Sequence, residues 1–261
     1  MTLFKHEMRV NKWQYIIWSL AVASMLGISL LIYPEMKSQM NELTDMFSQM
    51  GAFTEAFGMD KLNFGEFMGY FATECGNTIG LGGGIFAALV GVTALYKEES
   101  NGTAEFLLAH PISRTRVVLE KLSAVITQML VFVSASALVS ISAAAVIGES
   151  YEPKIMLLIF LAQLILQTEI ALICFAVSSL VRRGGIGIGI GLSALFYFMN
   201  ILSNITESLE FLKFITPYGY ADNARIVSEG NIDAIKLLIG AAIALICVIF
   251  SVYRYNKKEI L

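Results

Sequence analysis

Six long apolar runs dominate this chain and leave few alternatives to a membrane fold. They lie near residues 13–33, 72–95, 122–147, 155–181, 185–203 and 234–253. Each approaches the roughly 20 residues that a helix needs to cross a bilayer, and none alternates like a strand of a membrane barrel. Only 15% of the residues are charged, against about 25% in a typical soluble domain. We therefore predict an all-α membrane protein in which a single domain, residues 1–261, contains six transmembrane helices.

The first run predicts a retained helix, because it is too long for the core of a signal peptide and no small-residue cleavage site follows it. Cys75, Cys174 and Cys247 all fall inside predicted spans. Their spacing fits neither a disulfide framework nor a metal site, so we expect them to be small core residues.

Lysine and arginine are distributed unevenly between the two sides of the predicted spans. Twelve of the 18 lie on the side that carries both termini and the loop between the second and third spans, although the other side has the longer loops. The positive-inside rule places the richer side in the cytoplasm. We therefore predict a multi-pass protein of the cell membrane (a bacterial plasma membrane) with both termini cytoplasmic.

Three segments outside the spans have helical patterns. Residues 1–12 place Lys5, Arg9 and Lys12 on one face, which indicates an amphipathic lead-in helix in the headgroup layer or a solvated basic tail. Residues 34–71 carry a helical apolar stripe, which indicates a helix packed on the membrane face or an adaptable surface for cargo or a second subunit. In residues 204–233 a Pro-Tyr-Gly break predicts one or two short helices with tyrosines at headgroup depth.

The loop between the second and third spans has the most specific order of residues. Thr103 can cap a short helix over residues 104–109, after the breaker Gly102. Pro111 stops that helix, because the residue before a proline is pushed out of the α region. Ser113 can then cap the helix that enters the next span. A short capped helix on the basic side of a membrane protein predicts a docking element.

Glycines recur inside the second and fifth spans. The pairs Gly80–Gly84 and Gly187–Gly191 have the GxxxG spacing that lets helices approach closely. We expect a packing role, and a bendable, moving helix is the alternative.

Polar side chains inside the spans are candidates for a translocation pathway. Glu169 lies near the middle of the fourth span, where an ionisable group is costly; it either serves a cavity or gate or is a structural partner of another span. Gln163 and Gln167 share a face of that span, and Glu169 points away from it. Glu74, with Asn77 on its face, lies nearer the outer boundary, where a carboxylate can also reach water.

The sequence lacks the residues that several classes of function need. No GxxxxGK[ST] motif occurs, so we do not expect this chain to bind or split ATP by itself. His6 and His110 are the only histidines, and no carboxylate cluster accompanies them for metal ligation or acid–base catalysis. No serine lies in a nucleophile elbow. Basic residues follow the inside rule, which leaves nucleic-acid binding without support. We expect no catalytic residue, no metal and no cofactor in this chain.

Together these features resemble the permease subunits of ABC-2 type ABC transporters. The lead-in helix is similar to the family's elbow helix, and the segment at Pro217 resembles its outer re-entrant region. The loop between the second and third spans is similar to the family pattern E..-GT-E-LL-PISR. The resemblance implies that this loop couples to a separate ATPase through Glu98, Glu99, Thr103, Glu105, Phe106, Leu107, Leu108, Pro111, Ile112, Ser113 and Arg114.

The resemblance also implies a mechanism. Two permease subunits, identical or paralogous, pair in the bilayer above two ATP-binding subunits, and ATP-driven closure switches the spans between inward- and outward-facing states. ATP and Mg²⁺ bind the partner ATPase. Small outer loops favour export, and the apolar stripe favours an amphipathic or hydrophobic cargo such as a peptide or a drug. Efflux of sodium or another small ion, a membrane enzyme and a non-transporting scaffold are the alternatives.

Overall fold

The computed structural model describes residues 2–39, 51–56, 62–105 and 112–258. Within these ranges all regular structure is helical, and six helices are long and apolar enough to cross a membrane: α2 (Lys12–Ser38), α5 (Phe67–Ser100), α7 (Arg114–Ile147), α8 (Pro153–Leu180), α9 (Ile186–Ile205) and α11 (Ala234–Lys257). The predicted fold class, an all-α chain with six apolar spans, is confirmed. Several helices extend past the predicted apolar runs because their polar ends also remain helical.

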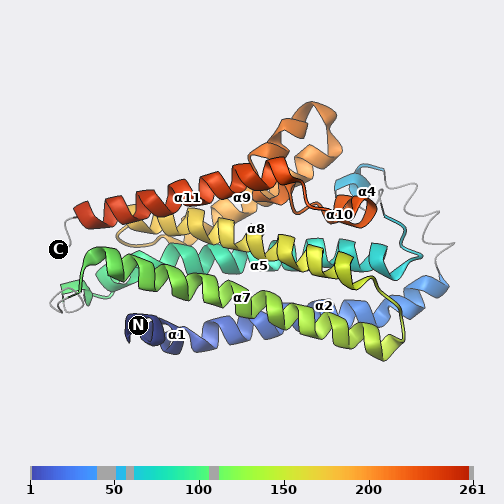
Figure 1. Cartoon of the computed structure of the whole chain (residues 1–261), viewed down its shortest axis with the longest axis horizontal. Coiled ribbons are helices and arrows are strands. Elements are labelled where there is room, and N and C mark those ends of the chain that lie inside the picture. Colours follow the sequence, from blue (N-terminus) through green and yellow to red (C-terminus); the bar gives the residue numbers. More distant parts are fainter. Residues whose placement is uncertain (1, 40–50, 57–61, 106–111, 259–261) are drawn as a thin grey trace.

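The long helices lie side by side, and α5 and α8 form the centre of the bundle (Figure 1). The most apolar stretches of α5 and α8 are 67% and 61% buried, whereas that of α11 is only 11% buried. The peripheral helices therefore present apolar side chains outward, as helices in a bilayer do.

The two ends of the bundle carry different short elements. One end, which we call the base, contains α1 (Thr2–Val10), the end of α5, the start of α7 and the end of α11 (Figure 1). The opposite end, which we call the apex, contains α4 (Ala52–Ala56) and α10 (Asn223–Glu229). Most of the predicted apolar stripe in residues 34–71 falls on residues 40–50, outside the described residues.

Local signals end α5 and begin α7, as the sequence predicts. Gly102 has a φ of 69°, a left-handed conformation that glycine adopts without a steric penalty. The N–H groups of Gly102 and Thr103 donate to the carbonyl oxygens of Glu99 and Glu98, which forms a Schellman motif. At the other side of the loop, the hydroxyl of Ser113 caps α7 by accepting from a backbone N–H at 3.3 Å.

The short helix predicted over residues 104–109 is described only at its start. Ala104 and Glu105 are helical, and residues 106–111 lie outside the described residues. The hydroxyl of Thr103 donates to the carbonyl oxygen of Glu98 at 3.4 Å. The docking helix itself therefore stays a prediction.

The chain after α9 folds back into the apex in short helices, which confirms that part of the sequence prediction. We call residues 206–229 the re-entrant segment; it contains η1 (Glu207–Phe214), η2 (Pro217–Gly219) and α10. The headgroup depth of its tyrosines stays a prediction, but their rings do not lie on the protein surface. Tyr218 and Tyr220 are 5% and 3% exposed, because the segment inserts them among the long helices, where their hydroxyls find acceptors.

Three glycines on one face of α5 make room for this segment. Gly76, Gly80 and Gly84 follow one another at intervals of four, which aligns them along the helix. A Cβ atom on Gly84 would lie 2.6 Å from the hydroxyl oxygen of Tyr218, and one on Gly76 would lie 2.9 Å from Nδ2 of Asn223. The predicted pair Gly80–Gly84 therefore packs as expected, but against a tyrosine ring and hydroxyl instead of another helix backbone.

Gly91 marks a close approach of α5 to α8 and supports a first prediction. A Cβ atom there would collide with the carbonyl oxygen of Ala171, a backbone atom that cannot rotate away. Gly91→Ala should therefore separate the two central helices and lower the free energy of unfolding by about 1–3 kcal/mol. Circular dichroism of the protein in detergent measures the change in Tm.

Gly187→Ala is the matched control for this prediction. No described residue lies within 4 Å of the position that a Cβ atom on Gly187 or Gly191 would occupy, so the predicted packing of that pair is not found among the described residues. Alanine is favoured over glycine in a helix by about 1 kcal/mol. Equal Tm values for Gly91→Ala and Gly187→Ala would contradict the close approach.

Candidate functional site

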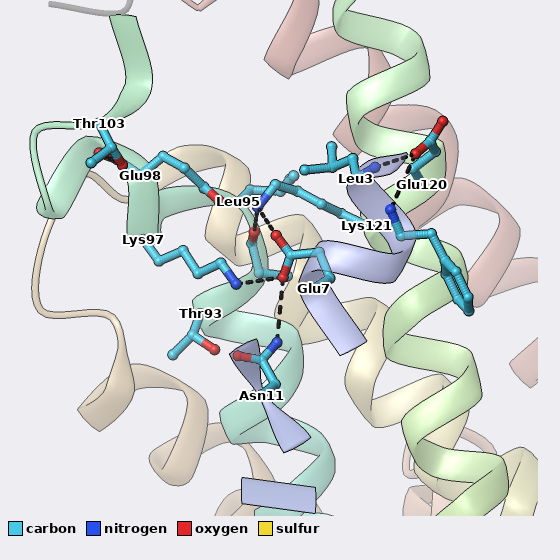
Figure 2. A network of polar contacts seen from close by, with 12 residues as sticks. Leu3, Glu7, Asn11, Thr93, Leu95, Lys97, Glu98, Thr103, Glu120 and Lys121 are labelled. Atoms are coloured by element: carbon cyan, nitrogen blue, oxygen red, sulfur yellow. Dashed lines mark hydrogen bonds and ion pairs between the residues drawn. The ribbon is translucent and has the colours of Figure 1, made fainter. Parts of the chain in front are cut away.

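The helix α1 is held on α7 by carboxylates at its start and in its middle (Figure 2). Glu120 of α7 accepts from the backbone N–H groups of Leu3 and Phe4 at 3.0 and 3.1 Å, which satisfies donors that every helix N-terminus leaves free. Glu7 of α1 faces inward and is 3% exposed, whereas Lys5 is exposed. The face of α1 that binds the bundle is therefore centred on Leu3 and Glu7, and the predicted basic face points away.

A buried lysine connects α1, α5 and α7 (Figure 2). Lys121 is 1% exposed, and its Nζ donates to Glu7 at 3.0 Å, to the carbonyl oxygen of Ala94 at 2.8 Å and to Glu98. These three acceptors use all three N–H donors of the ammonium group. Glu7 also pairs with Lys97. Two carboxylates and two ammonium groups thus neutralise one another, and the two that are fully buried, Glu7 and Lys121, are paired as buried charges require.

The pKa of Glu7 reflects two opposing effects in this network, burial and the attraction of two lysines. Burial alone raises a carboxyl pKa, but Lys121 and then Lys97 attract the carboxylate and hydrogen-bond to it, and together they hold the pKa of Glu7 below its usual value of 4.5. Glu7 therefore stabilises the fold above the pKa of the unfolded chain. This contribution is lost as the pH falls through the lowered pKa of the folded state.

A second set of contacts ties the same loop ends to α11. Glu99, at the end of α5, lies 2.7 Å from Nζ of Lys258, which also donates to the carbonyl oxygen of Val181 at 3.0 Å. Arg114, at the start of α7, donates from Nη1 to the carbonyl oxygen of Lys258 at 2.6 Å and to that of Tyr255 at 3.3 Å. A guanidinium group at a helix C-terminus satisfies carbonyl groups that have no partner within the helix.

The predicted coupling residues therefore fall into three groups. Glu98, Glu99 and Arg114 have partners inside the chain. Thr103, Glu105 and Ser113 are exposed, and Ile112 is half-buried. The remaining apolar residues of the predicted docking helix lie outside the described residues: Phe106, Leu107, Leu108 and Pro111. Contact with an ATPase stays a prediction for all of them.

Two of the predicted pathway residues meet in a polar pocket of about 70 Å³ near the apex. Asn77 of α5 and Gln163 of α8 line it together with Tyr197 of α9 and with Asp222 and Asn223 of the re-entrant segment. The hydroxyl of Tyr197 is 3.4 Å from Oδ1 of Asn77. The amide Nδ2 of Asn223 donates to the carbonyl oxygen of residue 72 at 2.8 Å, which fixes the re-entrant segment against α5.

The other three predicted pathway residues lie elsewhere. Glu74 accepts from the hydroxyl of Ser29 on α2 at 2.6 Å. Gln167 donates from Nε2 to the carbonyl oxygen of residue 79 at 3.2 Å, and Glu169 accepts from the hydroxyl of Tyr220 at 2.7 Å. None of these three side chains lines the pocket that Asn77 and Gln163 line, and a translocation path through the five residues stays a prediction. Within the described ranges, no three His, Cys, Asp or Glu side chains are grouped so as to hold a metal ion.

The sequence pattern does not assign a site role to the residues that organise both ends of the bundle. At the base these are Glu7, Glu120 and Lys121, and at the apex they are Tyr218, Asp222 and Asn223. Two features of the sequence could have pointed to these residues: Lys121 lies next to the start of a long apolar run, and Glu7 is an acid among basic residues. Neither feature shows that the two side chains, 114 positions apart, form a pair.

Glu169 links the middle of α8 to the re-entrant segment and supports a second prediction. It is 3% exposed, and the hydroxyl of Tyr220 donates to it. Glu169→Gln keeps an acceptor for that hydroxyl, so we expect near-normal yield and Tm. Glu169→Leu leaves the hydroxyl of Tyr220 without this acceptor, which should cost about 1–3 kcal/mol. Thermal unfolding in detergent compares them, and equal Tm values would contradict the bond.

The same two variants separate the alternatives for Glu169. A change in transport or in cargo-stimulated ATP hydrolysis for Glu169→Gln, at normal Tm, identifies a functional carboxylate. Wild-type activity in that variant identifies a structural hydrogen bond.

Six membrane-length helices with a buried polar network at one end define a multi-pass α-helical membrane protein. The sequence model of the family described as ABC-2 family transporter protein matches residues 1–260, so the chain belongs to the ABC-2 family. It is therefore an ABC-2 type membrane permease, a transport component of the membrane. No curated protein matches the chain.

Proposed function

We propose that this chain is the transmembrane subunit of an ATP-driven exporter, and that a separate ABC ATPase docks at the loop between α5 and α7. Membership of the ABC-2 family supports a partnership with an ATP-binding subunit. The observation that carries the docking position is the anchorage of both loop ends. Glu98 binds Lys121 of α7, Glu99 pairs with Lys258, and Arg114 binds the end of α11.

These contacts fix the helix ends next to the loop, as the transmission of force from a docked ATPase requires. A force on the loop cannot bend the ends of α5 and α7 separately, because buried ion pairs join them to each other and to α1. A force on the loop is therefore transmitted to α5, whose 34 residues span roughly 50 Å at 1.5 Å per residue. The apical end of α5 lines the polar pocket and receives Tyr218 between its glycines. Displacement at the base can thus alter the apex through one rigid helix.

The remaining parts of the proposal concern sidedness, partners and cargo. The base carries most of the lysine and arginine residues, which supports a cytoplasmic base and cytoplasmic termini. A second permease subunit, identical or paralogous, completes the transporter, and ATP and Mg²⁺ bind the ATPase subunits. The cargo is amphipathic or hydrophobic, because the spans present much apolar surface and few charges.

Co-purification tests the proposal. The tagged permease is expressed from its native genomic segment, so that neighbouring genes are expressed with it, and is purified in mild detergent. We expect an ATPase with a GxxxxGK[ST] motif to co-purify, and inside-out vesicles that contain both proteins to accumulate an amphipathic fluorescent dye when ATP is added. A permease that purifies without an ATPase and moves nothing would overturn the proposed function.

A further inference from the structure

The polar side chains that line the pocket at the apex indicate a function in addition to the proposed transport. This pocket is partly open and is lined by α4, Leu62, α5, α8, α9 and the re-entrant segment, and its described lining contains amides, tyrosines and one carboxylate among its polar groups. Its volume of about 70 Å³ exceeds several-fold the roughly 10–15 Å³ that one water molecule needs. One small polar group with a short carbon stem fits such a space.

Two oxygen atoms of the lining residues have no hydrogen-bond donor among the described residues. Gln163 is 1% exposed and Asn223 is 6% exposed, and Gln163 Oε1 and Asn223 Oδ1 are buried with no partner in the part of the chain that the structure describes. One N–H of the Asn223 amide donates to a carbonyl oxygen of α5, which fixes the orientation of the amide. An unpaired buried acceptor is costly, so this site calls for a ligand that donates hydrogen bonds or coordinates oxygen.

The charge at the site favours a cation. Asp222 lines the pocket, and one of its oxygens accepts from two backbone N–H groups at the start of α10. None of the described lining residues is Lys, Arg or His. Arg225, which is close in sequence, has its guanidinium paired with Glu229 and Asp233. Among the lining residues that the structure describes, no basic side chain neutralises the carboxylate of Asp222.

Two aromatic rings complete the site. Tyr197 and Tyr218 both line the pocket and meet edge to face, with ring centroids 5.6 Å apart. The hydroxyl of Tyr218 donates to the carbonyl oxygen of Gly80 at 2.8 Å. Aromatic faces attract ammonium groups and other cations. Rings, unpaired carbonyl oxygens and a carboxylate thus converge on one small volume.

We propose that this pocket binds a small monovalent cation, either an alkali ion or the primary ammonium group of an amphipathic cargo. The ligand lies between Gln163 Oε1, Asn223 Oδ1 and the Asp222 carboxylate. Binding itself needs no ATPase; only the assignment of the ammonium group to a transported cargo rests on the proposed function. A pocket that binds cations in a permease that recruits no ATPase would leave this proposal standing and remove the proposed function.

Thermal unfolding of the purified full-length chain, followed by circular dichroism in detergent, tests the site. The probes are ethylammonium chloride, sodium chloride, potassium chloride and tetramethylammonium chloride at matched ionic strength, with choline chloride as the balancing salt. We expect a saturable rise in Tm with ethylammonium, and none with tetramethylammonium, which has no N–H donor. Saturation with sodium or potassium at lower concentration than with ethylammonium would identify the alkali ion as the ligand.

Two variants and a matched control locate the binding site. Gln163→Leu removes an unpaired acceptor, and Asp222→Asn removes the charge but keeps an equally good N-cap for α10. Each should weaken the apparent Kd at least about tenfold, which corresponds to 1.4 kcal/mol. Gln128→Leu is the control, since Gln128 is also 1% exposed with an unpartnered Oε1, but lies outside this pocket. It should bind like the wild type.

Several results would overturn the proposal. One is the absence of any saturable response to ethylammonium, sodium or potassium. Another is a wild-type response in both Gln163→Leu and Asp222→Asn. A third is an equal loss in Gln128→Leu, which would show that the response does not come from this pocket.

Discussion

Lys121→Met is expected to destabilise the protein by about 3–5 kcal/mol, because removing one partner of a buried ion pair leaves an uncompensated buried charge. Lys121 is 1% exposed and serves both Glu7 and Glu98. Methionine fills a similar volume but supplies no donor. The loss should appear as a lower Tm by circular dichroism in detergent, and as looser packing of α1 in hydrogen exchange.

A double variant and a surface control make this expectation specific. Glu7→Gln combined with Lys121→Met removes one charge of each sign and leaves Lys97 and Glu98, so it should recover much of the lost stability. Arg116→Met breaks an ion pair with Glu120 in which the Arg116 side chain is 61% exposed. Surface ion pairs of this kind contribute about 0–1 kcal/mol. If Lys121→Met is as stable as Arg116→Met, the buried network does not hold the base together.

Leu107→Asp or Leu108→Asp is expected to release the ATPase without unfolding the permease. In the proposed function, we expect the apolar residues of the coupling helix to enter a groove of the ATPase. A charge buried there loses its hydration without gaining a partner, which costs several kcal/mol. A loss of about 4 kcal/mol is roughly a thousandfold in affinity. The variant should reach the membrane at a normal level, fail to retain its ATPase in a detergent pull-down, and fail to transport.

Leu107→Met is the matched control, because it keeps an apolar side chain of similar volume. It should retain the ATPase. Full recovery of the ATPase together with full transport in Leu107→Asp and in Leu108→Asp would remove the basis for assigning residues 103–114 to coupling.

Proximity along the chain explains which parts of this protein can be predicted. Six spans follow from apolar length, because a bilayer demands about 20 consecutive apolar residues whatever the neighbouring helices do. The end of α5 at Gly102 and the start of α7 at Ser113 depend on hydrogen bonds within a few residues. The short helices near Pro217 follow from the same local chemistry. These features are therefore readable before any tertiary contact is known.

The polar sites could not be read in this way. Asn77 and Gln163 are predicted as pathway residues, but nothing in the sequence separates them from Glu74, Gln167 and Glu169, which hydrogen-bond to α2, to α5 and to the re-entrant segment. Tyr218 was expected at the membrane surface, since a tyrosine fits an interface as well as a core. Its insertion depends on the space that Gly80 and Gly84 leave on α5.

By itself the sequence determined that this chain crosses a membrane with six helices, which side carries more positive charge, and where the loop between α5 and α7 begins and ends. Only the tertiary structure decided that Glu7, Glu98 and Lys121 form one buried network and that Asn77, Gln163 and Asn223 share one pocket. The physical reason is that apolar length and helix caps act locally. The partner of a buried charge or amide is chosen by packing, which brings together residues from distant parts of the chain.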